Sequence, residues 1–168
     1  MSLSSATRPD LTLRPALPAD AADLARIYTQ GIEDRTSTFE TKPRTAEDIL
    51  TWFDGQHPIQ VAERDGQVIA FASTSSYRAR ECYAGIAEFS VYVERSARGS
   101  GAGRTVLLSL IEAARTAGYW KLLSRVFPEN IASLRLLGSC GFREVGRYEK
   151  HGQLDGLWRD VVIVERLV

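Results

Sequence analysis

The chain is poor in the residues that build metal sites and disulfide frameworks. It has two cysteines, Cys82 and Cys140, and two histidines, His57 and His151, among 168 residues. No CxxC motif occurs, and the histidines lie far along the chain from each other and from both cysteines. We therefore expect no metal site and no disulfide framework. Two reduced thiols are typical of a cytoplasmic protein.

Long apolar runs and blocks of one charge are also missing. No apolar run approaches the roughly 18 residues that a membrane-crossing helix needs, and Met1 to Arg8 lacks the apolar core of a signal peptide. Basic and acidic residues balance at 21 each, and no basic stretch indicates nucleic-acid binding. The sequence therefore predicts neither a membrane nor a nucleic-acid partner.

Lysine is scarce, because Lys42, Lys121 and Lys150 are the only three among 21 basic residues. Arginine carries the rest of the positive charge, and its planar fork suits phosphates and carboxylates. The positions of single arginines are therefore more informative than the net charge of zero.

Hydrophobic periodicity and turn signals predict alternating strands and helices. We expect helices that begin near Pro18, with Asp20 as the cap, and at Thr45, which caps a buried stripe of Ile49, Trp52 and Phe53. Asp65-Gly66 predicts a hairpin, and Gly118 and Gly141 are expected to end two further helices. The expected strands are 11–14, 59–63, 67–73, 86–93, 122–126 and 161–167, and the two further helices are 103–117 and 133–140.

This order of elements predicts the fold class. A helical start is followed by antiparallel strands and then by strand, helix, strand, helix and strand, which is typical of an α/β (α+β) protein with a mixed sheet and helices on its faces. We expect residues 1–10 to form a flexible leader and residues 11–168 to form a single domain.

The most informative stretch runs from Ser90 to Arg104, where a strand leads through three glycines into a long helix. A helix N-terminus carries roughly half a positive charge and several unpaired N–H groups. Glycines let a phosphate oxygen approach those groups without a Cβ in the way, and Arg98 and Arg104 add charge. The stretch therefore predicts a cradle for a pyrophosphate.

Other readings of the glycines remain. A glycine-rich surface turn is possible, since spaced glycines alone are weak evidence. A P-loop would need Gly-Lys-Ser/Thr at its end, whereas Arg104-Thr105 follows Gly103. A dinucleotide-binding fold would place its glycines after the first strand and an acid about 20 positions later, and residues 118–126 contain no acid.

The motifs resemble those of a known family. Arg98-Gly99-Ser100-Gly101-Ala102-Gly103 resembles the Arg/Gln-x-x-Gly-x-Gly/Ala loop of the GCN5-related N-acetyltransferase (GNAT) superfamily. Four further segments are similar to its phosphinothricin and methionine sulfoximine N-acetyltransferase branch, which includes arsinothricin acetyltransferase-like enzymes. They are Thr36 to Thr41, Tyr77 to Arg80, Glu88 to Val93 and Asn130 to Ser133, and the collinear match runs from about Leu13 to Leu167.

The resemblance implies acetyl-CoA as cosubstrate, no metal, and a mostly antiparallel GNAT sheet. A strand would pair through its backbone with the pantetheine amides, and its side chains can at the same time pack in the core. Asn130 matches the asparagine that meets the cofactor, with Ser133 close by, although both can equally be helix caps. The residues implied for the cofactor are Val91, Tyr92, Val93, Arg98, Gly99, Ser100, Gly101, Ala102, Gly103, Arg104, Asn130 and Ser133.

Glu88 matches the glutamate that this branch uses as general base. An amine at neutral pH is mostly an ammonium ion and cannot attack a thioester until a proton leaves. The alternative is a solvent-facing glutamate on a strand. Alternation favours the catalytic role, because Glu88 shares a face with Ser90 and Tyr92 and not with the apolar positions between them. The tetrahedral oxyanion of direct attack would be stabilised by N–H groups of the Val91 to Val93 strand.

Arg78 and Arg80 match the basic residues that hold the acidic substrate in this branch. They lie two positions apart, so in an extended chain both point the same way and can form an anion clamp. Phe39 and Tyr83 match aromatic positions of the pocket. The alternatives are exposed loop arginines and a Tyr83 that belongs to the core.

Two positions depart from the branch. Leu137 stands where many relatives have a histidine with a supporting catalytic role, and Phe89 stands at a position that is often polar. The resemblance implies a homodimeric enzyme that detoxifies a small glutamate-analogue amino acid, such as phosphinothricin, methionine sulfoximine or arsinothricin, and so confers antibiotic or herbicide resistance. Acetylation of a protein or peptide N-terminus, and a non-catalytic acetyl-CoA sensor, are the alternatives.

Overall fold

The computed structural model describes residues 11–168, so the expected leader, residues 1–10, lies outside the described residues. Within residues 11–168, seven strands, four α-helices and three short 3-10 turns follow one another. In order they are β1 (Thr12–Pro15), η1 (Pro18–Asp20), α1 (Ala21–Asp34), α2 (Ala46–Leu50), β2 (Ile59–Arg64), β3 (Gln67–Ser76), η2 (Glu81–Tyr83), β4 (Ile86–Val93), η3 (Arg95–Ala97), α3 (Ala102–Thr116), β5 (Lys121–Val126), α4 (Ile131–Ser139), β6 (Arg143–Leu154) and β7 (Leu157–Leu167).

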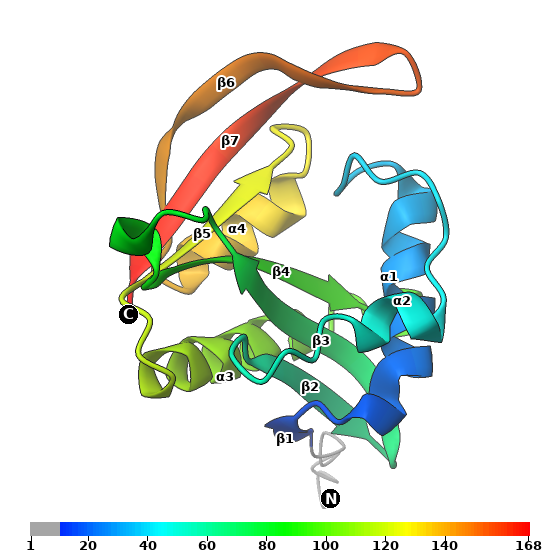
Figure 1. Cartoon of the computed structure of the whole chain (residues 1–168). Coiled ribbons are helices and arrows are strands. Elements are labelled where there is room, and N and C mark those ends of the chain that lie inside the picture. Colours follow the sequence, from blue (N-terminus) through cyan, green and yellow to red (C-terminus); the bar gives the residue numbers. More distant parts are fainter. Residues whose placement is uncertain (1–10) are drawn as a thin grey trace, which may run out of the picture.

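The strands form one mixed sheet in the order β1-β2-β3-β4-β5-β7-β6. Only the central pair, β4 and β5, is parallel; the other five pairs are antiparallel. Helices α3 and α4 cover one face, and α1 and α2 cover the other on the β1–β4 side of the sheet (Figure 1). The predicted fold class is therefore confirmed.

Apolar residues at helical spacing explain which helix faces are buried. In α1, Leu24 and Ile27 are fully buried against Val61 and Phe71 of the sheet. In α3, Val106, Leu107, Leu110 and Ile111 are buried against the opposite face. The sheet is thus packed on both faces, which holds β3 and β4 firmly in the middle of the molecule.

The predicted turn residues are confirmed where left-handed backbone is needed. Asp65 and Gly66 form the β2–β3 turn with φ of 53° and 75°, and Gly118 and Gly141 have φ of 94° and 84° after α3 and α4. Thr45 caps α2 as expected, because its hydroxyl accepts a hydrogen bond from the backbone N–H of Asp48.

The predicted cap at Asp20 is found on the first turn, η1, and not on α1. Asp20 has helical backbone angles at the end of η1, and its side chain makes no capping hydrogen bond to α1. Its carboxylate instead accepts from the backbone N–H of Leu17 at 2.7 Å and from the Arg14 guanidinium at 2.7 and 2.8 Å. These bonds lower the pKa of Asp20, with the Arg14 contact as the main cause. A charged partner on β1 therefore determines what this residue does.

Strand β6 was not predicted, and β7 begins four residues before the predicted Val161. Ten of the twelve β6 residues are exposed, so no alternation of buried and exposed positions marks the strand. The available signal was Asp155-Gly156, which forms the β6–β7 turn with φ of 50° and 78° in the same way as Asp65-Gly66.

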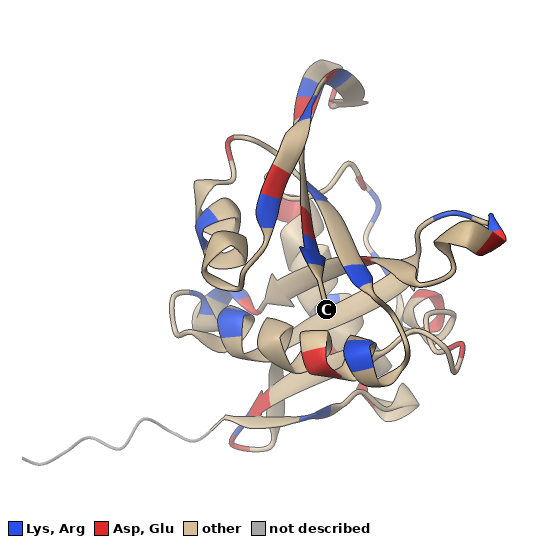
Figure 2. Ribbon diagram, turned by 90° about the vertical axis from the view of Figure 1, so that its left-hand side faces the viewer, with Lys and Arg blue, Asp and Glu red and all other residues tan. Residues whose placement is uncertain are grey.

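The β6–β7 hairpin extends well beyond the rest of the sheet and arches over the loop that follows α1 (Figure 1). Its tip contacts that loop through an ion pair between Arg35 Nε and Asp155 Oδ2 at 3.2 Å. A Cβ on Gly152 would lie 2.9 Å from the ring of Phe39, so glycine permits this close approach. Figure 2 shows basic and acidic residues interspersed along the hairpin and over the visible face of the molecule.

A matched pair of glycine substitutions tests the packing between α1 and β4. Gly31 is buried in α1, and a Cβ there would lie 2.6 Å from Cε1 of Tyr92. Gly31→Ala should therefore destabilise the protein by about 1–3 kcal/mol, because overpacking outweighs the gain in helix propensity.

The control is Gly138→Ala in α4, where no atom lies within 4 Å of the added Cβ. It should stabilise the protein by up to about 1 kcal/mol through helix propensity alone. Urea denaturation measures both changes. Equal stabilisation by the two variants would contradict the close contact between Gly31 and Tyr92.

Candidate functional site

The parallel strands β4 and β5 diverge after three residue pairs. They pair at Ile86↔Lys121, Ala87↔Leu122 and Glu88↔Leu123, whereas β4 continues to Val93 and β5 to Val126. Beyond the fork, β4 stays paired with β3 and β5 with β7. The edges that the two strands turn toward each other are therefore free of sheet partners.

A cavity of about 520 Å³ occupies this fork, and we call it the fork cavity. Its walls are Phe89 to Val93 on one side and Ser124 to Val126 on the other, and it reaches the start of α3 and the start of α4. The backbone of β4 can therefore pair with amide groups of a ligand, as one more strand would.

The start of α3 forms the end of the fork cavity. The first hydrogen bond of this region runs from Thr105 N to Gly101 O at 3.1 Å, so the N–H groups of Gly101 to Arg104 have no partner within the helix. Gly99 and Gly101 have φ of 78° and 88°, and no atom lies within 4 Å of a Cβ built on either. The arrangement presents bare N–H groups at the positive end of a helix dipole, which suits an anion.

Gly103 serves packing. A Cβ there would lie 3.0 Å from Leu136 and 3.1 Å from Val93, so glycine lets α3 pack closely on α4 and β4. Of the predicted loop residues, Arg98, Gly99, Gly101, Ala102, Gly103 and Arg104 line the cavity, and Ser100 instead donates a hydrogen bond to the Ala97 carbonyl at 2.6 Å.

Arg98 has an acidic partner beside the loop. Its Nη2 lies 2.7 Å from Oδ2 of Asp34, and Arg95 Nη2 lies 3.0 Å from the other oxygen of the same carboxylate. Desolvation opposes ionisation of Asp34, but the bonds to Arg95 and Arg98 outweigh it and lower the pKa of Asp34. Asp34 itself lines the cavity, and sequence reasoning did not find it. The charge of Arg98 is therefore partly neutralised.

Tyr92 lines the fork cavity, but its ring also packs among aromatic residues beneath α1. The ring centroid lies 5.6 Å from that of Phe71 and 4.9 Å from that of Tyr28. Removal from water raises the pKa of the Tyr92 phenol well above its usual range, so the phenol stays neutral at physiological pH. Val91 and Val93 pack on the α3 side of the sheet, which agrees with a backbone role for this strand.

The start of α4 supplies the remaining wall. Asn130 caps α4 by accepting a hydrogen bond from Ser133 N at 3.2 Å, so the expected cap at Asn130 is present, and both residues also line the cavity. Leu137 is 2% exposed and lines the same cavity, so this part of the wall is apolar. Phe89 is buried against Phe142, with ring centroids 4.7 Å apart.

Glu88 lies at the apex of the fork, as the last β4 residue that pairs with β5. Its Oε1 forms an ion pair with Nη1 of Arg125 at 2.9 Å. Arg125 lines the fork cavity, whereas Glu88 lies beside it. The side chains are 27% and 38% exposed, so solutes can reach both. Sequence reasoning missed Arg125, because its nearness to Glu88 follows from the pairing of Glu88 with Leu123 between β4 and β5.

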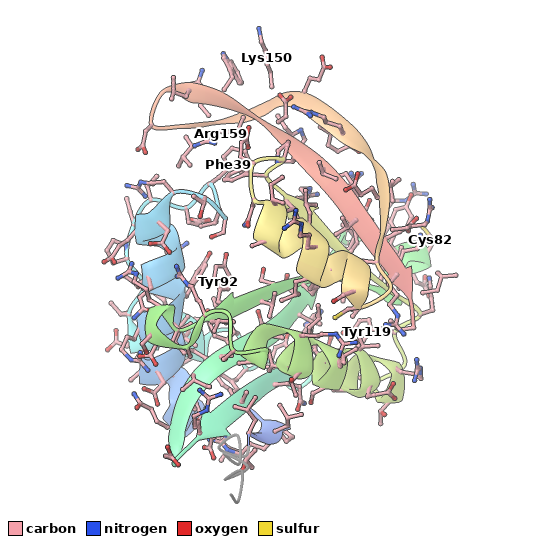
Figure 3. All side chains as sticks on the ribbon, turned by 180° about the vertical axis from the view of Figure 1, so that it is seen from behind. Phe39, Cys82, Tyr92, Tyr119, Lys150 and Arg159 are labelled. Carbon is pink, nitrogen blue, oxygen red and sulfur yellow. The ribbon has the colours of Figure 1, made fainter. Side chains whose placement is uncertain are left out.

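The predicted substrate residues are not brought to the cavity. Arg78 lies over the ring of Tyr77 and Arg80 over that of Tyr83, and neither they nor Tyr83 line the fork cavity. Their loop includes Cys82, which Figure 3 places on the far side of the molecule from Phe39 and Tyr92. Their part in substrate binding stays a prediction.

Phe39 lies under the hairpin arch. Its ring packs edge to face against that of Phe127, with centroids 4.9 Å apart. The Arg159 guanidinium lies over the Phe127 ring, 5.3 Å from its centroid, and Figure 3 shows Arg159 next to Phe39. Leu123 packs against the same cluster from β5. Phe39 therefore forms an aromatic wall on the face of β5 that carries Arg125, although it does not line the fork cavity itself.

A second cavity, of about 340 Å³, lies on the α1–α2 side and shares Ser90 and Tyr92 with the first. Hydroxyl groups of β3 line it, together with Asp54 and His57. Desolvation opposes ionisation of Asp54, but hydrogen bonds from His57 and Gln56 outweigh it and lower the pKa of Asp54 to about 2.

The part of the chain that the structure describes holds no group of three or more histidine, cysteine or acidic side chains that could bind a metal ion. None of its helices is long and apolar enough to cross a membrane.

Comparison with known proteins identifies the family. The model of the acetyltransferase (GNAT) family matches residues 24–142, which include the fork and the glycine loop. The chain belongs to this family. It is an N-acetyltransferase, as the resemblance of its motifs to this superfamily implied.

Relatives of this GNAT chain cover nearly its whole length. It is 31% identical to an L-methionine sulfoximine/L-methionine sulfone acetyltransferase of Pseudomonas paraeruginosa, over 92% of each chain. A ribosomal-protein-alanine N-acetyltransferase from Brucella melitensis is 34% identical, with a TM-score of 0.89 over 94% of this chain and 99% of the other. A phosphinothricin acetyltransferase from Sinorhizobium meliloti, solved in complex with acetyl-CoA, is 27% identical, with a TM-score of 0.87 over 94% and 88%.

Proposed function

We propose that this enzyme transfers an acetyl group from acetyl-CoA to the α-amino group of a small glutamate-analogue amino acid, of the phosphinothricin, methionine sulfoximine or arsinothricin type. The modified compound would lose its toxicity, so the activity would confer resistance. The observation that carries the proposal is the position of Glu88, at the apex of a fork whose other end is a glycine-lined helix N-terminus.

The residues of the fork fit acetyl-CoA. The bare N–H groups of Gly101 to Arg104 suit its diphosphate, and the free edge of Val91 to Val93 suits the two amides of its pantetheine arm. Asn130 and Ser133 line the same cavity, so the arm would run between them and β4. Acetyl-CoA supplies an acetyl thioester, whose carbonyl carbon an uncharged amine can attack.

Glu88 would act on the incoming amine. Its carboxylate attracts the ammonium form and accepts one proton from it, directly or through water, which leaves the lone pair of the nitrogen free. N–H groups on the free edge of β4 would stabilise negative charge on the acetyl oxygen as the amine attacks. The C–S bond of the thioester would then break, and coenzyme A would leave as the thiol or thiolate. Leu137 cannot exchange protons, so Glu88 would carry the proton transfer without help from that position.

The relatives support a small amino acid as the acceptor, since two of the three are named for methionine sulfoximine, methionine sulfone and phosphinothricin. The third is named for a ribosomal protein, which keeps acetylation of a protein N-terminus as the second candidate.

We also infer a homodimer in the cytoplasm. The β6–β7 hairpin exposes large apolar side chains at Val145, Tyr148, Leu157 and Trp158, which are 49–67% exposed. A second copy would bury such a surface.

A matched pair of variants tests the acetyl-CoA site. Gly101 and Gly118, at opposite ends of α3, both have positive φ and open space around a Cβ. Valine at either position should cost similar stability. Acetyl-CoA at about 100 times its Kd should stabilise the wild type by about 2.7 kcal/mol. Gly118→Val should keep the resulting rise in melting temperature and Gly101→Val should lose it. A full ligand shift in Gly101→Val would exclude the loop as the phosphate site.

Glu88→Gln tests the general base. The amide keeps the size of the side chain but cannot accept the proton, so kcat/KM should fall by roughly 10²–10⁴. Thiol release from acetyl-CoA in the presence of L-methionine sulfone measures the rate. The control is Glu112→Gln, which removes an exposed carboxylate paired with Arg115 on α3 and should leave the rate unchanged. Full activity of Glu88→Gln at neutral pH would remove Glu88 from the mechanism.

A further inference from the structure

Acetyl transfer to an amine requires a base such as Glu88 but does not require an arginine beside that base. The ion pair of Glu88 with Arg125 is therefore not explained by the transfer alone. Glu88 pairs with Leu123 across the parallel strands, and Arg125 follows two residues later, so both side chains lie on the same face of the sheet. Their charged groups are 2.9 Å apart, and neither is fully buried. Glu88 therefore already has a cation, the Arg125 guanidinium, beside it before a substrate ammonium binds.

A free α-amino acid carries the matching arrangement of charge. Its ammonium and carboxylate groups sit on one carbon, so the two opposite charges are as close together as those of the ion pair. The ammonium can take the place of Arg125 beside Glu88, and the guanidinium can then turn to the carboxylate and bind both oxygens in one plane. The exchange costs little, because partly exposed ion pairs contribute little to stability.

We propose that Arg125 binds the α-carboxylate of the acceptor, so that Glu88 and Arg125 together select a zwitterionic amino acid. The inference rests on the proposed function and names the group that recognises the acceptor. It also explains how Glu88 is released, since the substrate carboxylate engages Arg125 as its ammonium reaches the base.

The other arginines near the site are paired with other groups or lie away from Glu88. Arg98 is paired with Asp34, and Arg104 lies at the start of α3, at the far end of the cavity from Glu88. Arg159 lies over the Phe127 ring and 3.7 Å from Glu129. Among the arginines described as lining the fork cavity, Arg125 is the one that contacts Glu88.

Arg78 and Arg80 do not take this role in the described structure, because they lie over tyrosine rings outside the cavity. If they bind substrate at all, the second polar group of a glutamate analogue is left for them. The two sites would bind different groups of the substrate. Arg125 would bind the carboxylate next to the amine, and the loop with Arg78 and Arg80 would bind the distant head group.

The test compares L-methionine sulfone with its α-carboxamide, which keeps the amine and the side chain but has no carboxylate. Arg125→Ala should raise KM for the acid about ten- to hundredfold, the usual effect of one charge-assisted hydrogen-bonded contact. KM for the carboxamide should stay within about twofold of the wild-type value, since that acceptor has no carboxylate to lose. Arg125→Lys should recover part of the loss for the acid, because lysine keeps the charge but not the planar fork.

Two controls accompany these variants. Arg115→Ala removes an arginine from an exposed ion pair on α3 and should change neither KM. Thermal melting with acetyl-CoA shows whether Arg125→Ala is folded and still binds the cosubstrate; Arg125→Lys gives the same comparison with the charge retained if the alanine variant does not fold.

The outcomes separate the two claims. A selective rise in KM for the acid supports the inference. If the wild type acetylates L-methionine sulfone but Arg125→Ala leaves both KM values unchanged, or raises both equally, the inference is overturned and the proposed function stands. If the wild type acetylates neither acceptor but acetylates peptide N-termini, the proposed function and this inference both fail.

Discussion

The divergence of β4 and β5 is the constraint on which the rest of the site depends. Each strand is held on its outer side, β4 by β3 and β5 by β7, so the fork stays open although β4 and β5 are not paired beyond Glu88 and Leu123. The buried faces of α1 and α3 fix the β4 side, and α4 and the β6–β7 hairpin lie on the β5 side. The open edge of β4 leaves backbone N–H and C=O groups without a strand partner, and a ligand that carries amides can hydrogen-bond to them.

The two ends of the fork perform different chemistry by different means. At the wide end, backbone N–H groups at the start of α3 provide the anion site, while Asp34 offsets part of the arginine charge there. At the narrow end, two charged side chains stand close together where the strands are still paired. Glycines are therefore needed at the first end, because side chains would block the backbone, whereas side-chain identity decides function at the second.

Much of this could be predicted from the sequence, because local patterns encode it. Alternation along 86–93 predicted β4 with its bounds, and the glycines of 99–103 predicted an anion site before α3. The ion pair of Asp20 with Arg14 could not be predicted locally, because Arg14 comes from another element. Strand β6 escaped because both of its faces are exposed over most of its length. The nearness of Arg125 to Glu88 was not predicted, because it depends on the register between β4 and β5, which no local sequence pattern encodes.

Amide hydrogen exchange with and without acetyl-CoA tests the central claim most directly. If the fork is the acetyl-CoA site, saturating ligand should slow exchange in Phe89–Val93 and in residues 99–104, because those N–H groups gain hydrogen-bond partners. Exchange in residues 51–57 and 73–76, which include most of the lining of the second cavity, should not change. Protection of the second cavity with no change in β4 or the glycine loop would contradict the account.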